Sequence, residues 1–209
     1  MTLPVLYSFR RCPYAMRARL AIASAGIQVE LREILLRDKA PDFLAISPSA
    51  TVPCLVSDRE IIDQSRDIMT WALTKSDPAG WLDMPDEGQR IVDAVEGPFK
   101  TALDRYKYST RYENANKTIE RDNASSILLD LNRQLEGQAF LFGGRPTFAD
   151  MATLPFIRQF AMVDKVWFDA QNWPHLSRWV EAFLTSDRFR AIMTKYPVWK
   201  SGDQVTIFA

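Results

Sequence analysis

The spacing of apolar residues changes once along the chain, and this change limits the folds that the chain can adopt. Before about residue 75, short apolar runs alternate with stretches of helical spacing. They predict strands at 3–9, 28–35, 52–56 and 60–62 and helices at 13–25, at 42–45 and from Ser65 onward. Beyond residue 86 every periodic stretch has helical spacing. The sequence therefore predicts a small α/β unit followed by an all-helical unit.

A linker is predicted between these two units. Residues 74–86 read TKSDPAGWLDMPD, with two prolines, one glycine and no periodicity. We therefore place one domain at residues 1–76, a linker at 77–86 and a helical domain at 87–209. Within the helical domain, helices are predicted at 87–112, at 117–136, from Thr147 and at 174–195, with a kink at Gly97-Pro98.

Composition narrows the class of protein. The 209 residues carry 26 basic and 26 acidic side chains, so no net field attracts nucleic acid or an anionic membrane surface. No apolar run is long enough for a membrane span, and the start of the sequence lacks a signal-peptide pattern. Two cysteines are too few for a disulfide scaffold, which favours a reducing, cytoplasmic location.

The thiol of Cys12 lies where the first predicted strand gives way to the first helix. Pro13 follows at the first helical position, so Cys12 is predicted to be the N-cap. Free backbone N–H groups and the positive end of the helix dipole stabilise a thiolate there. Ala15 stands where a C-x-x-C pair has its second cysteine, so redox chemistry would need a resolving thiol from another molecule. The alternative is an inert cysteine packed as a small apolar residue.

Other charged and sulfur-bearing residues receive simpler interpretations. Arg10, Arg11, Arg17 and Arg19 are expected on a solvated face, with Arg10 and Arg11 near enough to Cys12 to favour its thiolate. We expect Cys54 in the core, turned away from Cys12 by strand alternation. The sequence contains one histidine, which leaves no ligand set for a metal.

Four separated motifs support a family resemblance. They are Cys12-Pro13-Tyr14, Val52-Pro53-x-Leu55, Gln64-Ser65 and the run Gly144 to Asp150. In this order they resemble the cytosolic glutathione transferase family, in particular its cysteine-type, omega-like members. The resemblance implies a thioredoxin-like N-terminal domain, a helical C-terminal domain and a homodimer.

The resemblance also implies how glutathione, the co-substrate, would bind. The Val52–Pro53 peptide bond would be cis, with the backbone of Val52 pairing with the cysteinyl residue of glutathione. Ser65, at a helix start, would bind the γ-glutamyl carboxylate. Gln64 stands where many members have glutamate, and would hydrogen-bond the amino group. Lys39 would lie near the glycyl carboxylate.

The second substrate would be a small electrophile or a mixed disulfide. The resemblance suggests Tyr14, Tyr106 and Arg111 as lining for the electrophile pocket, although aromatic residues on helices more often belong to the core. Thr147 and Asp150 form a capping-box pattern, for which we expect a role in folding.

The sequence thus predicts a glutathione transferase that reduces disulfides through a Cys12–glutathione mixed disulfide. Two alternatives stay open at this point. One is a conventional conjugating transferase, in which Tyr7 or Ser8 stabilises the glutathione thiolate; against this, Tyr7 is also interpretable as a packed strand residue. The other is a non-enzymatic interaction protein on the same fold.

Overall fold

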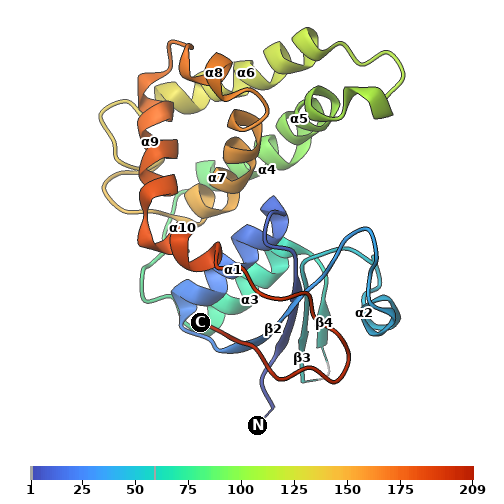
Figure 1. Ribbon diagram of the computed structural model, residues 1–209. Helices are drawn as coiled ribbons and strands as arrows, with labels where there is room; N and C mark the ends of the chain where they lie inside the picture. Colours follow the sequence, from blue (N-terminus) through green and yellow to red (C-terminus); the bar gives the residue numbers. More distant parts are fainter. Residues whose placement is uncertain (1, 59) are drawn as a thin grey trace. The chain divides into compact units, whose positions relative to one another are not determined.

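The structure is a computed structural model that describes residues 2–58 and 60–209. The chain folds into two compact units (Figure 1). The first comprises Met1–Gly80 together with Ser186–Ala209, and the second comprises Trp81–Thr185. The expected fold class, a thioredoxin-like unit followed by a helical unit, is confirmed.

A mixed five-stranded sheet forms the centre of the first unit, in the order β4-β3-β1-β2-β5. The strands are β1 (Val5–Ser8), β2 (Val29–Glu33), β3 (Cys54–Ser57), β4 (Glu60–Ile62) and β5 (Ile207–Phe208). β1 and β2 are parallel, whereas every other neighbouring pair is antiparallel. The predicted turn Ser57-Asp58-Arg59 between β3 and β4 includes Arg59, which lies outside the described residues.

Helices cover both faces of this sheet. α1 (Pro13–Ala25) packs against α3 (Ser65–Lys75) on one face, and α2 (Pro41–Ile46) lies on the other (Figure 1). A cluster between α2 and the sheet consists of Phe43 from α2 and of side chains from two strands and the segments beside them: Tyr7, Ile34, Val52 and Cys54. Phe9 and Cys12 pack against the same cluster.

α1 begins and ends where the sequence predicts. Cys12 is the N-cap, Pro13 is the first helical residue, and Gly26 ends the helix with a φ of 66° in the left-handed region. The expectation that Arg17 and Arg19 face solvent is wrong, since both are buried. Apart from its arginines, α1 is almost entirely small or apolar, and a helix of that kind is buried on most sides.

The second unit is helical throughout. Its α-helices are α4 (Glu87–Ala94), α5 (Lys100–Lys107), α6 (Lys117–Gln134), α7 (Phe148–Ala161), α8 (Lys165–Asp169) and α9 (Pro174–Thr185). The predicted kink at Gly97-Pro98 falls within a π-helical segment, Val95–Phe99, that joins α4 to α5; Ser109–Arg111 adds one 3₁₀ turn. In the described part of the chain, no helix is both long and apolar enough to cross a membrane.

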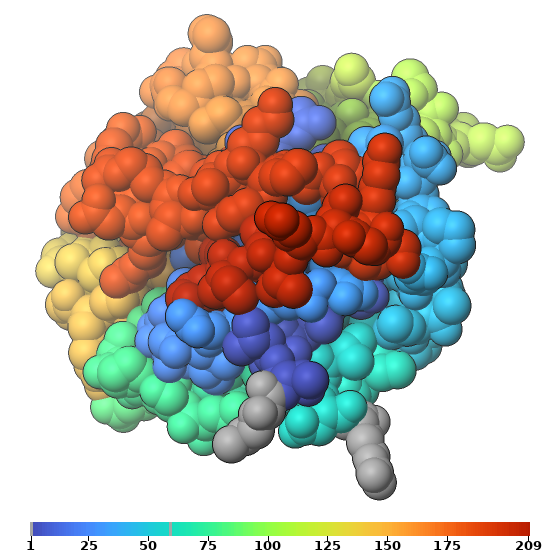
Figure 2. All heavy atoms as spheres, turned by 60° about the horizontal axis from the view of Figure 1, so that its bottom comes forward, coloured from blue at the N-terminus to red at the C-terminus, as the bar shows by residue number. Residues whose placement is uncertain are grey.

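The C-terminal segment returns to the first unit. α10 (Asp187–Ile192) starts afresh at Ser186, whose hydroxyl accepts a hydrogen bond from the Phe189 N–H. The predicted helical domain of 87–209 therefore differs from the structure, in which residues 186–209 group with the sheet. Figure 2 shows this segment in red across the blue and cyan surface of the first unit. β5 holds it there by pairing with β2, and the Trp199 N–H donates to the Glu33 carbonyl over 2.9 Å.

Candidate functional site

The turn between β1 and α1 places the Cys12 thiol against the main chain of Val52. The Cys12 N–H donates to the Phe9 carbonyl over 3.0 Å, which fixes the turn. The half-buried Sγ then donates to the Val52 carbonyl at 3.7 Å. Two residues 40 positions apart in the sequence are thus in contact, at the start of a 13-residue helix.

The Val52 main chain has the features of a peptide-binding edge. The Val52–Pro53 peptide bond is cis, as the resemblance implied. Within the described residues, the Val52 N–H donates no hydrogen bond to another group. A buried amide without a partner is rare in folded proteins, so this N–H suits an extended ligand that supplies a carbonyl.

The start of α3 brings together Ser65, Arg17 and Tyr14. Ser65 is the first residue of α3 and is buried, and its hydroxyl accepts a hydrogen bond from Arg17 Nε over 2.9 Å. The Arg17 guanidinium lies over the Tyr14 ring, 5.3 Å from the ring centroid. Gln64 is the N-cap, is exposed, and makes no side-chain hydrogen bond to the first turn.

Lys39 lies in the loop before α2. It lines a pocket of about 490 Å³ together with Trp199 and Lys200 from the C-terminal segment. Among the described residues, no hydrogen bond or ion pair joins Lys39 to Cys12, Val52 or Ser65.

Tyr106 and Arg111 belong to the second unit. Tyr106 is buried, its ring centroid lies 5.5 Å from that of Phe160, and burial raises the pKa of its hydroxyl. Arg111 is exposed, with its guanidinium 4.4 Å from the centroid of the Tyr108 ring. The structure therefore places Tyr106 in the core of its unit and Arg111 on the surface.

Comparison with known proteins identifies the family. Residues 6–79 match the family model described as "Glutathione S-transferase, N-terminal domain", and residues 90–182 match "Glutathione S-transferase, C-terminal domain". Together these matches cover most of the chain. The chain belongs to the glutathione S-transferase family.

Relatives come from several classes of this family. Glutathione S-transferase D7 of Drosophila melanogaster is 25% identical over 186 residues, which is 84% of this chain and 82% of the relative. Glutathione transferase omega-1 of Caenorhabditis elegans is 21% identical over 214 residues, covering 90% and 79%. A crystal structure of a glutathione transferase family member from Pseudomonas fluorescens, described as having two glutathione molecules bound, has a TM-score of 0.78 and 19% identity. The matched region covers 91% of this chain and 92% of the Pseudomonas fluorescens chain.

Tyr7 and Ser8, the other hydroxyl groups considered for a transferase site, are both fully buried. The Tyr7 hydroxyl accepts a hydrogen bond from Arg32 Nη1 over 2.7 Å, and its ring packs against Phe43 and Trp199. Burial raises the pKa of Tyr7, although the Arg32 guanidinium acts in the opposite direction. The Ser8 hydroxyl has no hydrogen-bond partner among the described residues.

Cys54 is a core residue of this transferase, as predicted. It is fully buried, and burial raises the pKa of its thiol to about 11. The expectation that it faces away from Cys12 is wrong, because both side chains pack in the cluster between α2 and the sheet. Val52, two positions before Cys54, belongs to the same cluster.

Sequence reasoning missed a buried polar group around Arg19 and Glu33. Arg19 Nη1 donates to the Ile192 carbonyl over 3.0 Å, and a Glu33 carboxylate oxygen accepts from the Arg10 N–H over 2.7 Å. Burial lowers the pKa of Arg19, and the negative charges of Glu33 and Cys12 oppose this shift. The near-absence of polar residues elsewhere on α1 was the signal that its arginines are enclosed.

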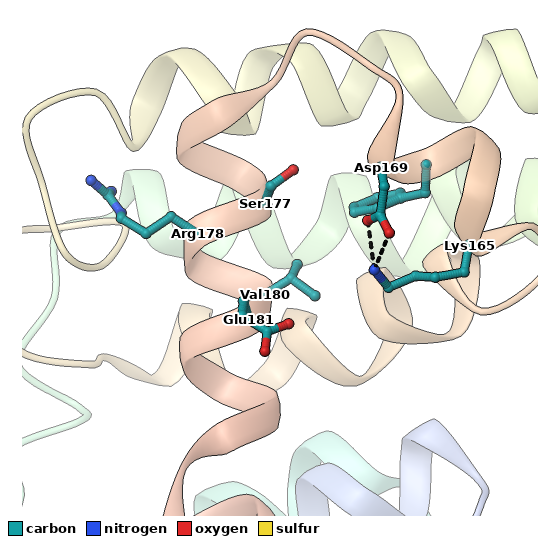
Figure 3. A pocket seen from close by; sticks show the side chains of 7 residues that line it. Lys165, Asp169, Ser177, Arg178, Val180 and Glu181 are labelled. Atoms are coloured by element: carbon teal, nitrogen blue, oxygen red, sulfur yellow. Dashed lines mark hydrogen bonds and ion pairs between the residues drawn. The ribbon is translucent and has the colours of Figure 1, made fainter.

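A second hollow lies in the helical unit, between α8 and α9 (Figure 3). Its volume is about 310 Å³, and none of the predicted site residues lines it. Lys165 pairs with Asp169 across one wall, while Ser177 and Glu181 project from α9. Oppositely charged side chains alternate around it, so it presents no concentrated charge to a ligand.

Proposed function

We propose that this transferase carries out glutathione-dependent thiol transfer and disulfide reduction, with Cys12 as the nucleophile. The observation that carries the proposal is the contact between Cys12 Sγ and the Val52 carbonyl, at 3.7 Å. Val52 is the residue to which the family resemblance assigns the cysteinyl part of glutathione. A glutathione molecule bound there would bring its own sulfur next to the Cys12 thiol.

The reaction proceeds in two exchanges. In the first, the Cys12 thiolate attacks the glutathionyl sulfur of a mixed disulfide, the sulfur–sulfur bond breaks, and the partner thiolate leaves. In the second, the thiolate of another glutathione attacks the Cys12–glutathione disulfide. This step releases glutathione disulfide and regenerates the Cys12 thiolate. In the net reaction one glutathione thiol is oxidised, the partner thiol is released in reduced form, and the glutathionyl group of the mixed disulfide leaves in glutathione disulfide.

The second glutathione is needed because Cys54 is a poor resolving thiol. At neutral pH a thiol with a pKa of about 11 is almost entirely protonated, and Cys54 is fully buried. The similar Pseudomonas fluorescens structure is described as having two glutathione molecules bound, which supports a site that accepts a second glutathione.

Glutathione recognition is assigned to residues of the first unit. The Val52 N–H and carbonyl would pair with the cysteinyl residue beside Pro53. Ser65 would donate to the γ-glutamyl carboxylate, and Gln64 would bind the amino group. Lys39 would approach the glycyl carboxylate. For the electrophile side we propose Tyr14, the one of the three suggested residues that belongs to the first unit.

Conjugation through Tyr7 or Ser8 fits the first unit less well. To stabilise a glutathione thiolate, a hydroxyl must donate to a sulfur at the protein surface. The Tyr7 hydroxyl is enclosed and occupied by Arg32, and the Ser8 hydroxyl is enclosed as well. An interaction protein without catalysis would have no use for a thiol held at a helix start against a glutathione-binding main chain.

The test compares wild type with Cys12→Ser, Cys12→Ala, Tyr7→Phe and, as a matched control, Cys54→Ala. Each variant is assayed for glutathione-dependent reduction of a small mixed disulfide, for dehydroascorbate reduction and for conjugation of an aromatic halide. Mass spectrometry of the protein after exposure to glutathione disulfide locates any glutathionyl adduct.

We expect both Cys12 variants to lose disulfide reduction by about 100-fold or more, as removal of a nucleophile does. Cys54→Ala should retain it, and the glutathionyl adduct should map to Cys12. Full disulfide reduction in Cys12→Ala would refute the mechanism. A selective loss of conjugation in Tyr7→Phe would favour the conjugating alternative, and a wild-type protein that binds no glutathione would favour the interaction protein.

A further inference from the structure

Arg17 is a buried cation with a specific partner. Its side chain is in α1, only 2% of the residue is exposed, and Ser65 at the start of α3 is 3% exposed. The hydrogen bond from Arg17 Nε to Ser65 Oγ joins residues 48 positions apart over 2.9 Å. Burying a guanidinium is costly unless it is paired, and the Ser65 hydroxyl is one of the groups that pair with it.

The direction of this hydrogen bond constrains the Ser65 hydroxyl. A guanidinium has only N–H donors, so Ser65 Oγ must accept from Arg17. The single hydroxyl hydrogen is then directed elsewhere. A charged donor also polarises the hydroxyl, which makes its own O–H a stronger donor to a third group.

We propose that Arg17 is a positioning residue. By donating to Ser65 Oγ, it orients the Ser65 hydroxyl so that the O–H donates to the γ-glutamyl carboxylate of glutathione. This inference rests on the proposed function, since it takes Ser65 as part of the glutathione site. It adds what selects the ligand: Arg17 makes this end of the site specific for γ-glutamyl groups that carry a free α-carboxylate.

The neutral residue before Ser65 increases the importance of Arg17. Gln64 offers no charge to the ligand's ammonium group, so electrostatic recognition of the γ-glutamyl end depends on the carboxylate. Asp67 is the acidic residue of the first turn of α3 and is exposed, whereas Arg17 is enclosed. A buried charge is screened less by solvent than an exposed one, so the Arg17 charge acts on Ser65 with little screening.

The test measures binding of two probes by calorimetry. One is S-methylglutathione, which cannot undergo thiol exchange. The other is the same molecule without the γ-glutamyl α-carboxylate. Wild type is compared with Arg17→Met, Arg17→Lys, Ser65→Ala and the double variant Arg17→Met/Ser65→Ala. Arg133→Met, which removes an exposed arginine from the second unit, controls for the change in net charge.

We expect wild type to prefer S-methylglutathione over the truncated probe by about tenfold or more, as charge-assisted hydrogen bonds allow. Arg17→Met should weaken the binding of S-methylglutathione about tenfold and that of the truncated probe by less than about twofold, so that the preference nearly disappears. Arg17→Lys should keep part of the preference that Arg17→Met loses. The double variant should bind almost as Ser65→Ala does, because the two residues act as one unit. In turnover, Arg17→Met should raise the KM for glutathione and leave kcat largely unchanged.

A merely structural Arg17 would give a different pattern. Both probes would then weaken equally, and the preference of wild type would persist in Arg17→Met, which overturns the inference. If Arg17→Met does not fold, the neutral variant Arg17→Gln takes its place, and full preference in Arg17→Gln or in Ser65→Ala overturns the inference. Failure of wild type to bind either probe refutes the proposed function as well, whereas binding with an unchanged preference refutes the role of Arg17 alone.

Discussion

Glu33 lies between three parts of the first unit, and its carboxylate is largely enclosed. One carboxylate oxygen accepts from the Arg10 N–H, and the Glu33 carbonyl accepts from Trp199. The other carboxylate oxygen has no hydrogen-bond partner among the described residues. Arg19, fully buried, supplies the opposite charge.

Burial raises the pKa of Glu33 above its ordinary value of 4.5, although Arg10 and Arg19 act in the opposite direction. The Glu33 carboxylate therefore binds a proton more tightly in the folded protein than in the unfolded chain. Stability contributed by the protonated form is present at low pH and is lost as the pH rises from about 4.5 through the raised pKa.

Glu33→Gln should remove this part of the pH dependence, since an amide does not ionise. We expect the free energy of unfolding of wild type to fall relative to that of Glu33→Gln as the pH rises from 4 to 7. Urea unfolding at several pH values measures the difference. The exposed Glu136→Gln is the control, and parallel pH profiles for wild type and Glu33→Gln would contradict the prediction.

At the scale of elements, Asp150 connects three segments of the helical unit. Its carboxylate accepts from the N–H and hydroxyl of Thr147, from the Leu141 N–H and from the Trp179 indole N–H. The capping box at the start of α7 was predicted and is confirmed. The bonds to Leu141 and Trp179 extend it to a loop and to α9.

Asp150→Ala should therefore destabilise the protein more than Thr147→Ala. Loss of a cap costs about 1 kcal/mol, whereas removal of the Asp150 carboxylate leaves several buried donors unpaired and should cost about 3 kcal/mol or more. Chemical denaturation measures both values. The exposed Asp130→Ala serves as control, and equal losses for Thr147→Ala and Asp150→Ala would show that Asp150 acts as a cap only.

Elements with local signals were predictable. Pro13 and Gly26 bound α1 through their own backbone preferences, and the Cys12 N-cap follows from the same residues. β5 was missed because two residues, Ile207 and Phe208, give no periodic pattern; their strand exists only because β2 offers an edge. α8, with five residues, lacks a pattern for the same reason.

The candidate site shows the same division. The family motifs predicted Cys12, Val52 and Ser65, and the structure places Cys12 against Val52. The bond between Arg17 and Ser65 was not predictable from spacing, because a charged residue in a helix is usually exposed. The packing of α1 against α3 brings the two side chains together.

At the scale of the whole molecule, the first unit is built from both ends of the chain. Residues 186–209 add α10 and β5 to it, and Ile192 and Phe208 are buried there. A homodimer and a cytoplasmic location stay predictions from the family resemblance.

A chain that ends at Thr185 should have a weakened first unit. β2 would lose its neighbour β5 and become an unpaired edge, and Arg19 would lose the Ile192 carbonyl. We expect faster hydrogen exchange in β2 and α1, with helices α4 to α7 little changed, as measured by mass spectrometry. The full chain with Val205→Ala, an exposed position, is the control. Unchanged exchange in β2 would contradict the prediction.

The pairing of β5 with β2 also sets an order of assembly during synthesis. The residues of β1, α1 and β2 leave the ribosome first, but the strand that covers the outer edge of β2 is made after the whole helical unit. Until then β2 is open to pairing with another chain. The helical unit is inserted between the two chain segments that form the first unit. A protein designed to contain the first unit alone must therefore include residues 186–209 as well as the N-terminal segment.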